Sequence, residues 1–219
     1  LCVDNGPHMR FGTRGTFKTT QAARAAALLG WAANGHGDRV GGIVFGDAEA
    51  GMQHYRPTKD RRALWQLLNE LTRAGSHPAQ GVDCLERVLQ RADRGAGTGA
   101  LIVVVADFNR EPMGLDRALG PLCQRHSVVL VPVDDVADRE LPPVGRALFR
   151  GVDGELLEVD TSDANGRIAY SQAWRTRRDT LVRLAHRLGV AVIPVATDVD
   201  VHRPLMEGLL RRARSRARL

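Results

Sequence analysis

The sequence predicts a doubly wound α/β fold, in which a mostly parallel sheet carries helices on both faces. Apolar segments of strand length alternate with helical patterns along the 219 residues, as they do when crossover helices join parallel strands. Residues 101–105 are apolar at every position, which is typical of a central strand covered on both faces. An acid follows each of four apolar strands, at Asp4, Asp107, Asp134 and Asp198. Ligands of such sheets bind beyond the carboxyl ends of the strands, so we expect the functional crevice there.

Four strands and three helices are expected in the first half of the chain. Residues 1–4 read as the end of a strand, so we expect the chain to be a fragment that enters this strand partway. Alanines or leucines recur at helical spacing in the three predicted helices, which cover residues 17–33, 59–73 and 82–92. The remaining strands are predicted over residues 39–45, 52–56 and 101–105. The first two of these three are expected to form one antiparallel edge hairpin, which Pro57 ends.

The second half of the chain continues the alternation of helices and strands. Helices are predicted over residues 115–125 and 169–188, with a last helix that begins near Pro204. Strands are predicted over residues 128–133 and 190–195, and a Pro-rich loop over 136–145. Two further short strands, 147–150 and 156–159, are expected to pair around the turn Asp153-Gly154. We expect one α/β domain over residues 1–202, followed over 203–219 by a C-terminal helix with an Arg-rich tail.

The distribution of charge, apolar residues and cysteines narrows the range of possible functions. The formal net charge is +6, and residues 203–219 hold six arginines against Glu207. This tail reads as a solvated helix end, where the helix dipole favours arginine, and nucleic-acid binding through the tail is the alternative. No apolar run approaches the roughly 20 residues that cross a bilayer. Cys2, Cys84 and Cys123 are widely spaced and read as buried free thiols in a reducing, cytoplasmic compartment.

Asp4 and Asp107 are the candidate metal ligands. If the first strand and strand 101–105 are neighbours, the carboxylates of Asp4 and Asp107 meet where the strand order reverses. Two carboxylates at one place suit Mg²⁺. Acids at strand ends also support an alternative function as a metal-dependent phosphoesterase or nuclease. The stretch from Gly12 to Lys18 does not have the spacing of a phosphate loop, so Lys18 is expected to cap or pair near the site. Three tryptophans on predicted helices are expected to be packing residues: Trp31, Trp65 and Trp174.

Several motifs, taken in order, resemble one known family. Residues 4–9, Asp-Asn-Gly-Pro-His-Met, fall where von Willebrand factor A domains carry Asp-x-Ser-x-Ser, their metal-ion-dependent adhesion site. The order of the further motifs is similar to that of a bacterial A-domain-like family of unknown function, encoded beside MoxR-type AAA+ ATPases. These motifs are Met9–Thr13, Lys18, Gly37–Gly42, Phe45-Gly46-Asp47, Arg56-Pro57, Ala106-Asp107-Phe108 and Glu140-Leu141-Pro142. In that family a further segment precedes this one.

The metal motif departs from the family pattern. Gly6 and His8 stand where the two serines are expected, and Val82 stands at the expected threonine, with Asp83 beside it as a further acid. Imidazole is a poorer Mg²⁺ ligand than a hydroxyl and could favour a softer ion such as Zn²⁺. The alternative is a metal-free site in which both acids accept hydrogen bonds from loop amides.

The resemblance also implies a function. It implies a non-enzymatic protein-interaction module that serves as an adaptor for a MoxR-type AAA+ ATPase. Four residues are expected to meet the partner: Asp4, His8, Arg10 and Asp107. No small-molecule substrate is expected.

Overall fold

The computed structural model of the protein describes residues 1–46, 52–73, 85–109, 115–151 and 154–216. Among these residues, seven strands form one sheet. Six of them follow the order β3-β2-β1-β4-β5-β8, and β9 pairs with the last two residues of β5, after the stretch of β5 that pairs with β8. The neighbouring strands of this sheet are parallel except β2 and β3. The strands are β1 (Cys2–Asp4), β2 (Val40–Phe45), β3 (Gln53–Thr58), β4 (Leu101–Ala106), β5 (Ser127–Asp134), β8 (Ala191–Val192) and β9 (Val195–Ala196). The predicted fold class, with its antiparallel edge hairpin, is confirmed.

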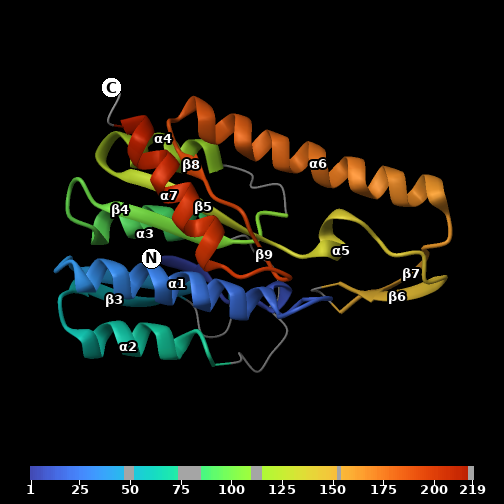
Figure 1. The fold of residues 1–219 in the computed structure, drawn as a ribbon, viewed down its shortest axis with the longest axis horizontal. Coiled ribbons are helices and arrows are strands. Elements are labelled where there is room, and N and C mark those ends of the chain that lie inside the picture. The colour runs from blue at the N-terminus through green and yellow to red at the C-terminus, as the bar shows by residue number, and fades with distance from the viewer. Residues whose placement is uncertain (47–51, 74–84, 110–114, 152–153, 217–219) are drawn as a thin grey trace.

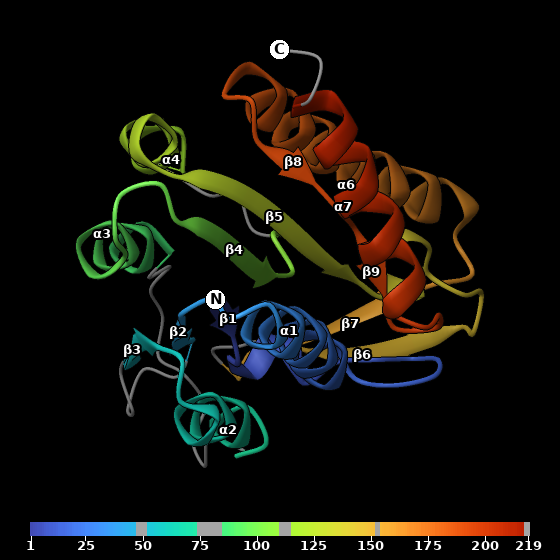
Figure 2. The ribbon, with the colours of Figure 1, turned by 60° about the vertical axis from the view of Figure 1, so that its left-hand side comes forward.

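Helices cover both faces of this sheet (Figures 1 and 2). One face is covered by α1 (Lys18–Gly35), α2 (Arg61–Glu70) and α7 (His202–Arg216), and the other by α3 (Leu85–Gly95), α4 (Leu115–Arg125) and α6 (Ala164–Arg187). Strand β4 shows why both layers form. Its Val103 and Val105 enter the core with α1, whereas Ile102 and Val104 enter the core with α3 and α4. Each valine buried in this way stabilises the fold by about 1.5–3 kcal/mol relative to exposure.

The strand order reverses between β1 and β4. Strand β1 pairs with β2 on one side and with β4 on the other, and Val3 lies opposite Val105. Asp4 is the last residue of β1, and Asp107 directly follows β4. The two acids therefore follow neighbouring strands at the reversal point, as the sequence predicts.

The strands at both edges of the sheet differ from the predicted strands, and each difference involves a proline. Strand β3 does not end before Pro57 but continues to Thr58, because an edge strand has one side on which a missing N–H is tolerated. Its register against β2 shifts between Val40 and Gly42, next to this proline. The strand predicted over 190–195 is split into β8 and β9, because Pro194 cannot donate a ladder hydrogen bond.

Two helices differ from the predicted pattern because aspartates cap them. A short helix, α5 (Val136–Arg139), replaces the start of the predicted loop, where Asp135 and Asp138 form a reciprocal capping box. Helix α6 begins earlier than expected, because the Asp163 side chain accepts hydrogen bonds from the N–H groups of Asn165 and Gly166.

The second hairpin lies apart from the main sheet. Strands β6 (Arg146–Arg150) and β7 (Leu156–Asp160) pair antiparallel, as predicted. They lie beside the N-terminal end of α6, away from the other strands (Figure 1). Their Leu148 and Leu157 are 65% and 64% exposed. Asp153 of the predicted turn lies outside the described residues.

Several side chains have an exposure that differs from expectation. Trp31 and Trp65 are 41% and 61% exposed and are therefore not core residues, while Trp174 is half-buried. Small residues such as Ala22 and Ala26 cover the sheet instead, on a different face of α1 from Trp31. None of the helices in the described ranges has the length and apolar character to cross a membrane.

The cysteines that the structure describes are free thiols. Cys2 is buried and Cys123 is half-buried, and burial raises the pKa of both thiols. Cys84 lies outside the described residues. The expectation of buried free thiols is met at Cys2.

Candidate functional site

Asp4 is held by the loop that follows β1. Its side chain is buried, with Oδ1 accepting a hydrogen bond from the N–H of Gly6 at 2.9 Å. A short 3-10 helix over Pro7–Met9 turns His8 back, so that His8 Nε2 lies 2.8 Å from Asp4 Oδ2. The fully buried Met9 fixes this turn on the core. Both carboxylate oxygens of Asp4 therefore have partners within the same loop.

Asp107 shares a buried lysine with Asp138. Lys18 is the first residue of α1, and only 2% of it is exposed. Its Nζ lies 2.7 Å from Asp138 Oδ2 and 3.5 Å from Asp107 Oδ2. The other oxygen of Asp107, Oδ1, accepts a hydrogen bond from the N–H of Asn109 at 3.1 Å. The ring of Phe11 lies 5.6 Å from the ammonium group, within the range of a cation–π contact.

Asp134 forms the next buried pair along this edge, with Arg178 of α6. The Arg178 guanidinium hydrogen-bonds Asp134 Oδ1 and the main-chain oxygen of Asp107. It also lies 5.4 Å from the Trp174 ring. Burial raises the pKa of Asp134 to about 6, although the neighbouring Arg178 acts in the opposite direction. Arg178 therefore connects α6 to the ends of β4 and β5.

Asp135 anchors the loop over residues 5–17 to the sheet. It is fully buried and accepts hydrogen bonds from Thr13 N–H, Thr13 Oγ1, Ala137 N–H and Thr197 Oγ1. Burial alone acts to raise the pKa of Asp135, but these hydrogen bonds to the carboxylate outweigh it and lower the pKa. One carboxylate thus ties together the loop, α5 and the segment after β9.

Residues 1–180 match the family described as protein of unknown function DUF58. The chain belongs to this family. Uncharacterized proteins of Mycobacterium tuberculosis and Mycobacterium bovis are each 24% identical to it over 200 residues, which are 91% of this chain. An uncharacterized protein of Mycobacterium avium is 29% identical over 112 residues, which are 51% of this chain and 64% of that protein. The DUF58 chain spans 62% of the length of the M. tuberculosis and M. bovis relatives.

Two solved structures are similar to this DUF58 chain over most of its length. A von Willebrand factor type A protein from Catenulispora acidiphila aligns with a TM-score of 0.47 and 14% identity, over 97% of this chain and 41% of that one. An uncharacterized membrane spanning protein from Vibrio fischeri aligns with a TM-score of 0.35 and 15% identity, over 95% of both chains.

The described residues of this DUF58 chain do not fit a magnesium ion. They contain no group of three histidine, cysteine or acidic side chains that could hold a metal. The Lys18 ammonium lies between Asp107 and Asp138, while Asp4 is directed to Gly6 and His8. Asp4 and Asp107 each accept a hydrogen bond from a loop N–H group. This is the arrangement expected for the alternative site without a metal. Val82 and Asp83 lie outside the described residues.

Sequence reasoning found part of this network. The expectation that Lys18 pairs near the site is confirmed, but its partner Asp138 and the cation Arg178 were missed. The spacing of Asp135 and Asp138 just after a strand is a capping-box signal that could have located both acids. Asp198 is exposed, in contrast to the buried acids at the ends of β1, β4 and β5, so the four acids do not form a uniform rim.

The raised pKa of Asp134 predicts a specific dependence of stability on pH. The shift from 3.8 to about 6 means that the folded state binds a proton more tightly than the unfolded state does. The associated stability is fully present below the unfolded pKa and is lost as the pH rises through about 6. We expect the free energy of unfolding of the wild type, minus that of Asp134→Asn, to fall by about 3 kcal/mol between about pH 3.5 and pH 7. Urea denaturation across this range measures it, and a flat or rising difference would contradict it.

Proposed function

We propose that this protein is a non-enzymatic protein-interaction module that binds its partner through the loop over residues 5–17. The observation that carries the proposal is how this loop is built. Hydrogen bonds from Thr13, in the middle of the loop, to Asp135 fix it to the end of β5, while Arg10 is exposed and Phe11 and Phe17 are 38% and 54% exposed. A rigid loop that presents arginine and aromatic side chains has the composition of protein interfaces, and it loses little conformational freedom on binding.

Four residues of the proposed contact surface have different roles. Arg10 is exposed and would touch the partner directly, with the half-buried His8 beside it. Asp4 and Asp107 are buried and would shape the surface from beneath, Asp4 by holding His8 and Asp107 by contacting Lys18. The surface therefore offers a positive charge beside apolar rings and would fit an acidic patch on the partner.

The same geometry supports a binding role rather than phosphoester hydrolysis. Hydrolysis of this kind uses carboxylates that are available to metal ions and water. In the described part of the chain, Asp4, Asp107 and Asp134 each have a cationic or imidazole partner within the protein. These contacts direct the carboxylates inward and leave the exposed loop as the surface for recognition.

The proposed partner is a MoxR-type AAA+ ATPase in the cytoplasm, for which this protein would act as an adaptor. The support for this partner is the resemblance carried by the motifs along the chain. Its identity is tested first by measuring binding of the wild type to the purified ATPase from the same genome, with and without ATP. Absence of binding under both conditions would remove this partner.

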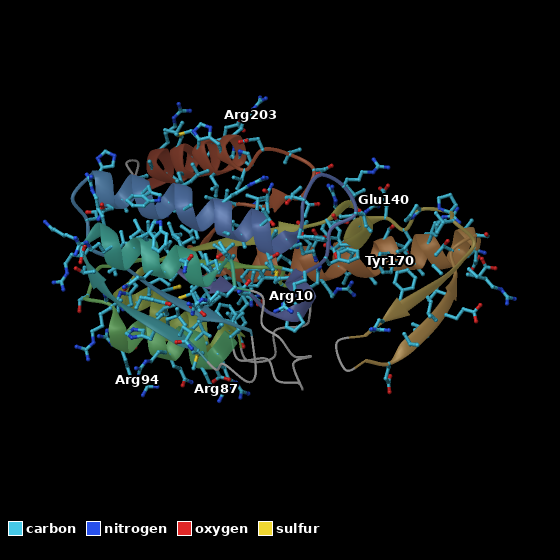
Figure 3. The ribbon with its side chains drawn as sticks, turned by 90° about the horizontal axis from the view of Figure 1, so that it is seen from below. Arg10, Arg87, Arg94, Glu140, Tyr170 and Arg203 are labelled. Carbon is cyan, nitrogen blue, oxygen red and sulfur yellow. The ribbon has the colours of Figure 1, made fainter. Side chains whose placement is uncertain are left out.

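The contact surface is tested by reversing one exposed charge. We expect Arg10→Glu to weaken binding about tenfold or more, because an interfacial arginine commonly contributes about 1.4 kcal/mol or more. The matched control is Arg87→Glu, which makes the same change at an exposed position of α3, away from Arg10 (Figure 3). Titration by biolayer interferometry should leave the control within about twofold of the wild type. Equal affinities of the two variants would exclude this surface.

A further inference from the structure

We propose that Lys18 is a tethered cation that takes the place of a divalent metal ion at the carboxyl end of the sheet. Its ammonium group closes the site to Mg²⁺ and holds the carboxylates of Asp107 and Asp138 together, as a metal ion bound between them would. This inference concerns the site itself, so it stands whether or not the partner proposed above is found.

The first support is where the ammonium lies. Lys18 is 2% exposed, and a lysine is almost never buried to this extent without a charged partner. Its Nζ reaches carboxylates from two separate elements, Asp107 after β4 and Asp138 of α5. A divalent cation that bound between these two acids would have to occupy the space of the ammonium group, and it would be repelled by that charge.

The second support is the charge balance. The two cations Lys18 and Arg178 form ion pairs with three carboxylates, those of the buried Asp107 and Asp134 and that of the half-buried Asp138. With both cations present, one negative charge remains. Without Lys18 two would remain, which is the charge that a single divalent cation neutralises. Lys18 therefore supplies part of the compensation that a bound metal provides in a carboxylate site.

The third support is that the local structure fixes Lys18 in place. The backbone N–H of Lys18 donates to the main-chain oxygen of Phe11 at 2.8 Å, which sets the start of α1. The Phe11 ring then covers the ammonium group at 5.6 Å. Positive charge at this position is also close to the positive N-terminal end of the helix dipole, an unfavourable interaction that the two acids offset. The ammonium is thus held by three elements and not by a flexible surface contact.

The test compares thermal unfolding of the wild type, Lys18→Met and Lys18→Met/Asp138→Asn, each in EDTA and in excess Mg²⁺ or Mn²⁺. We expect the wild-type Tm to be unchanged by either metal. Lys18→Met should unfold at a lower temperature in EDTA, and metal at about ten times its Kd should raise its Tm by about 3–5 °C. The double variant has one negative charge fewer and should lose this response to metal.

Two results would overturn the inference. The first is a wild-type protein that binds Mg²⁺ or Mn²⁺ in calorimetry and loses this binding in Asp107→Asn. The second is a Lys18→Met variant that keeps the wild-type Tm and does not respond to metal. If Lys18→Met does not fold in EDTA, folding of the double variant in EDTA is measured instead. Recovery of folding in Lys18→Met/Asp138→Asn supports the charge-balancing role of Lys18, and continued failure to fold counts against it.

Discussion

Replacing Asp135 by alanine is expected to lower the free energy of unfolding by about 4 kcal/mol or more. The change removes an acceptor that serves two N–H groups and two hydroxyl groups, from Thr13, Ala137 and Thr197, in a fully buried position. A hydrogen bond to a charged group contributes about 1.5–3 kcal/mol, and donors that are left buried without a partner add a desolvation cost. The loop over residues 5–17 would lose its attachment to β5.

The matched control for this change is an aspartate that caps a helix at the surface. Asp60 accepts a hydrogen bond from the N–H of Arg62 at the start of α2, in an exposed position. Asp60→Ala should cost about 1 kcal/mol, as is usual for loss of an N-cap. Urea denaturation of both variants measures the difference. Equal costs would show that Asp135 acts as an ordinary cap and not as the anchor of the loop.

Gly46→Ala is expected to lower the free energy of unfolding by about 3–4 kcal/mol and to displace Asp4. Gly46 has a φ of +100°, in the region that disfavours residues with a Cβ. A Cβ at this position would lie 2.4 Å from Asp4 Oδ1 and 2.6 Å from the backbone nitrogen of Gly6. The substitution therefore combines backbone strain with a collision against the Asp4 carboxylate and against the Gly6 N–H that donates a hydrogen bond to it.

Gly37 separates these two effects. It also has a positive φ, of +82°, but a Cβ built there meets no atom within 4 Å. Gly37→Ala should therefore show only the strain, at about 1–2 kcal/mol. The NMR chemical shifts of the His8 ring provide a second measurement, because its contact with Asp4 should be disturbed by the change at Gly46 and unaffected by the change at Gly37. Identical His8 ring shifts in both variants would contradict the placement of Asp4.

The sheet with helices on both faces, and the point at which its strand order reverses, could be predicted because both depend on local sequence patterns. An apolar segment such as 101–105 identifies a central strand, and the acid after it marks the carboxyl edge. The neighbouring positions of Asp4 and Asp107 follow from topology alone. Such features need no knowledge of which side chains meet across the fold.

The contacts within the site could not be predicted in the same way. Asp138 and Arg178 lie far along the chain from Lys18, on α5 and α6, and only the folded sheet edge brings the cations and acids together. The exposure of Trp31 and Trp65 was missed for a related reason. Helical spacing identifies the helix but does not say which of its residues pack against the sheet. In this helix the small alanines do so.

The interruptions at the two sheet edges have a consequence for self-association. An unbroken edge strand presents a row of unpaired N–H and C=O groups that can recruit another chain into a shared sheet. At one edge, Pro57 and the shifted register of β3 remove part of that row, and at the other the Pro194 break leaves only two short strands. Neither edge offers a long template, so polymerisation by strand addition is disfavoured at both ends of the sheet. Concentrated protein should therefore resist cross-β fibril growth through this sheet.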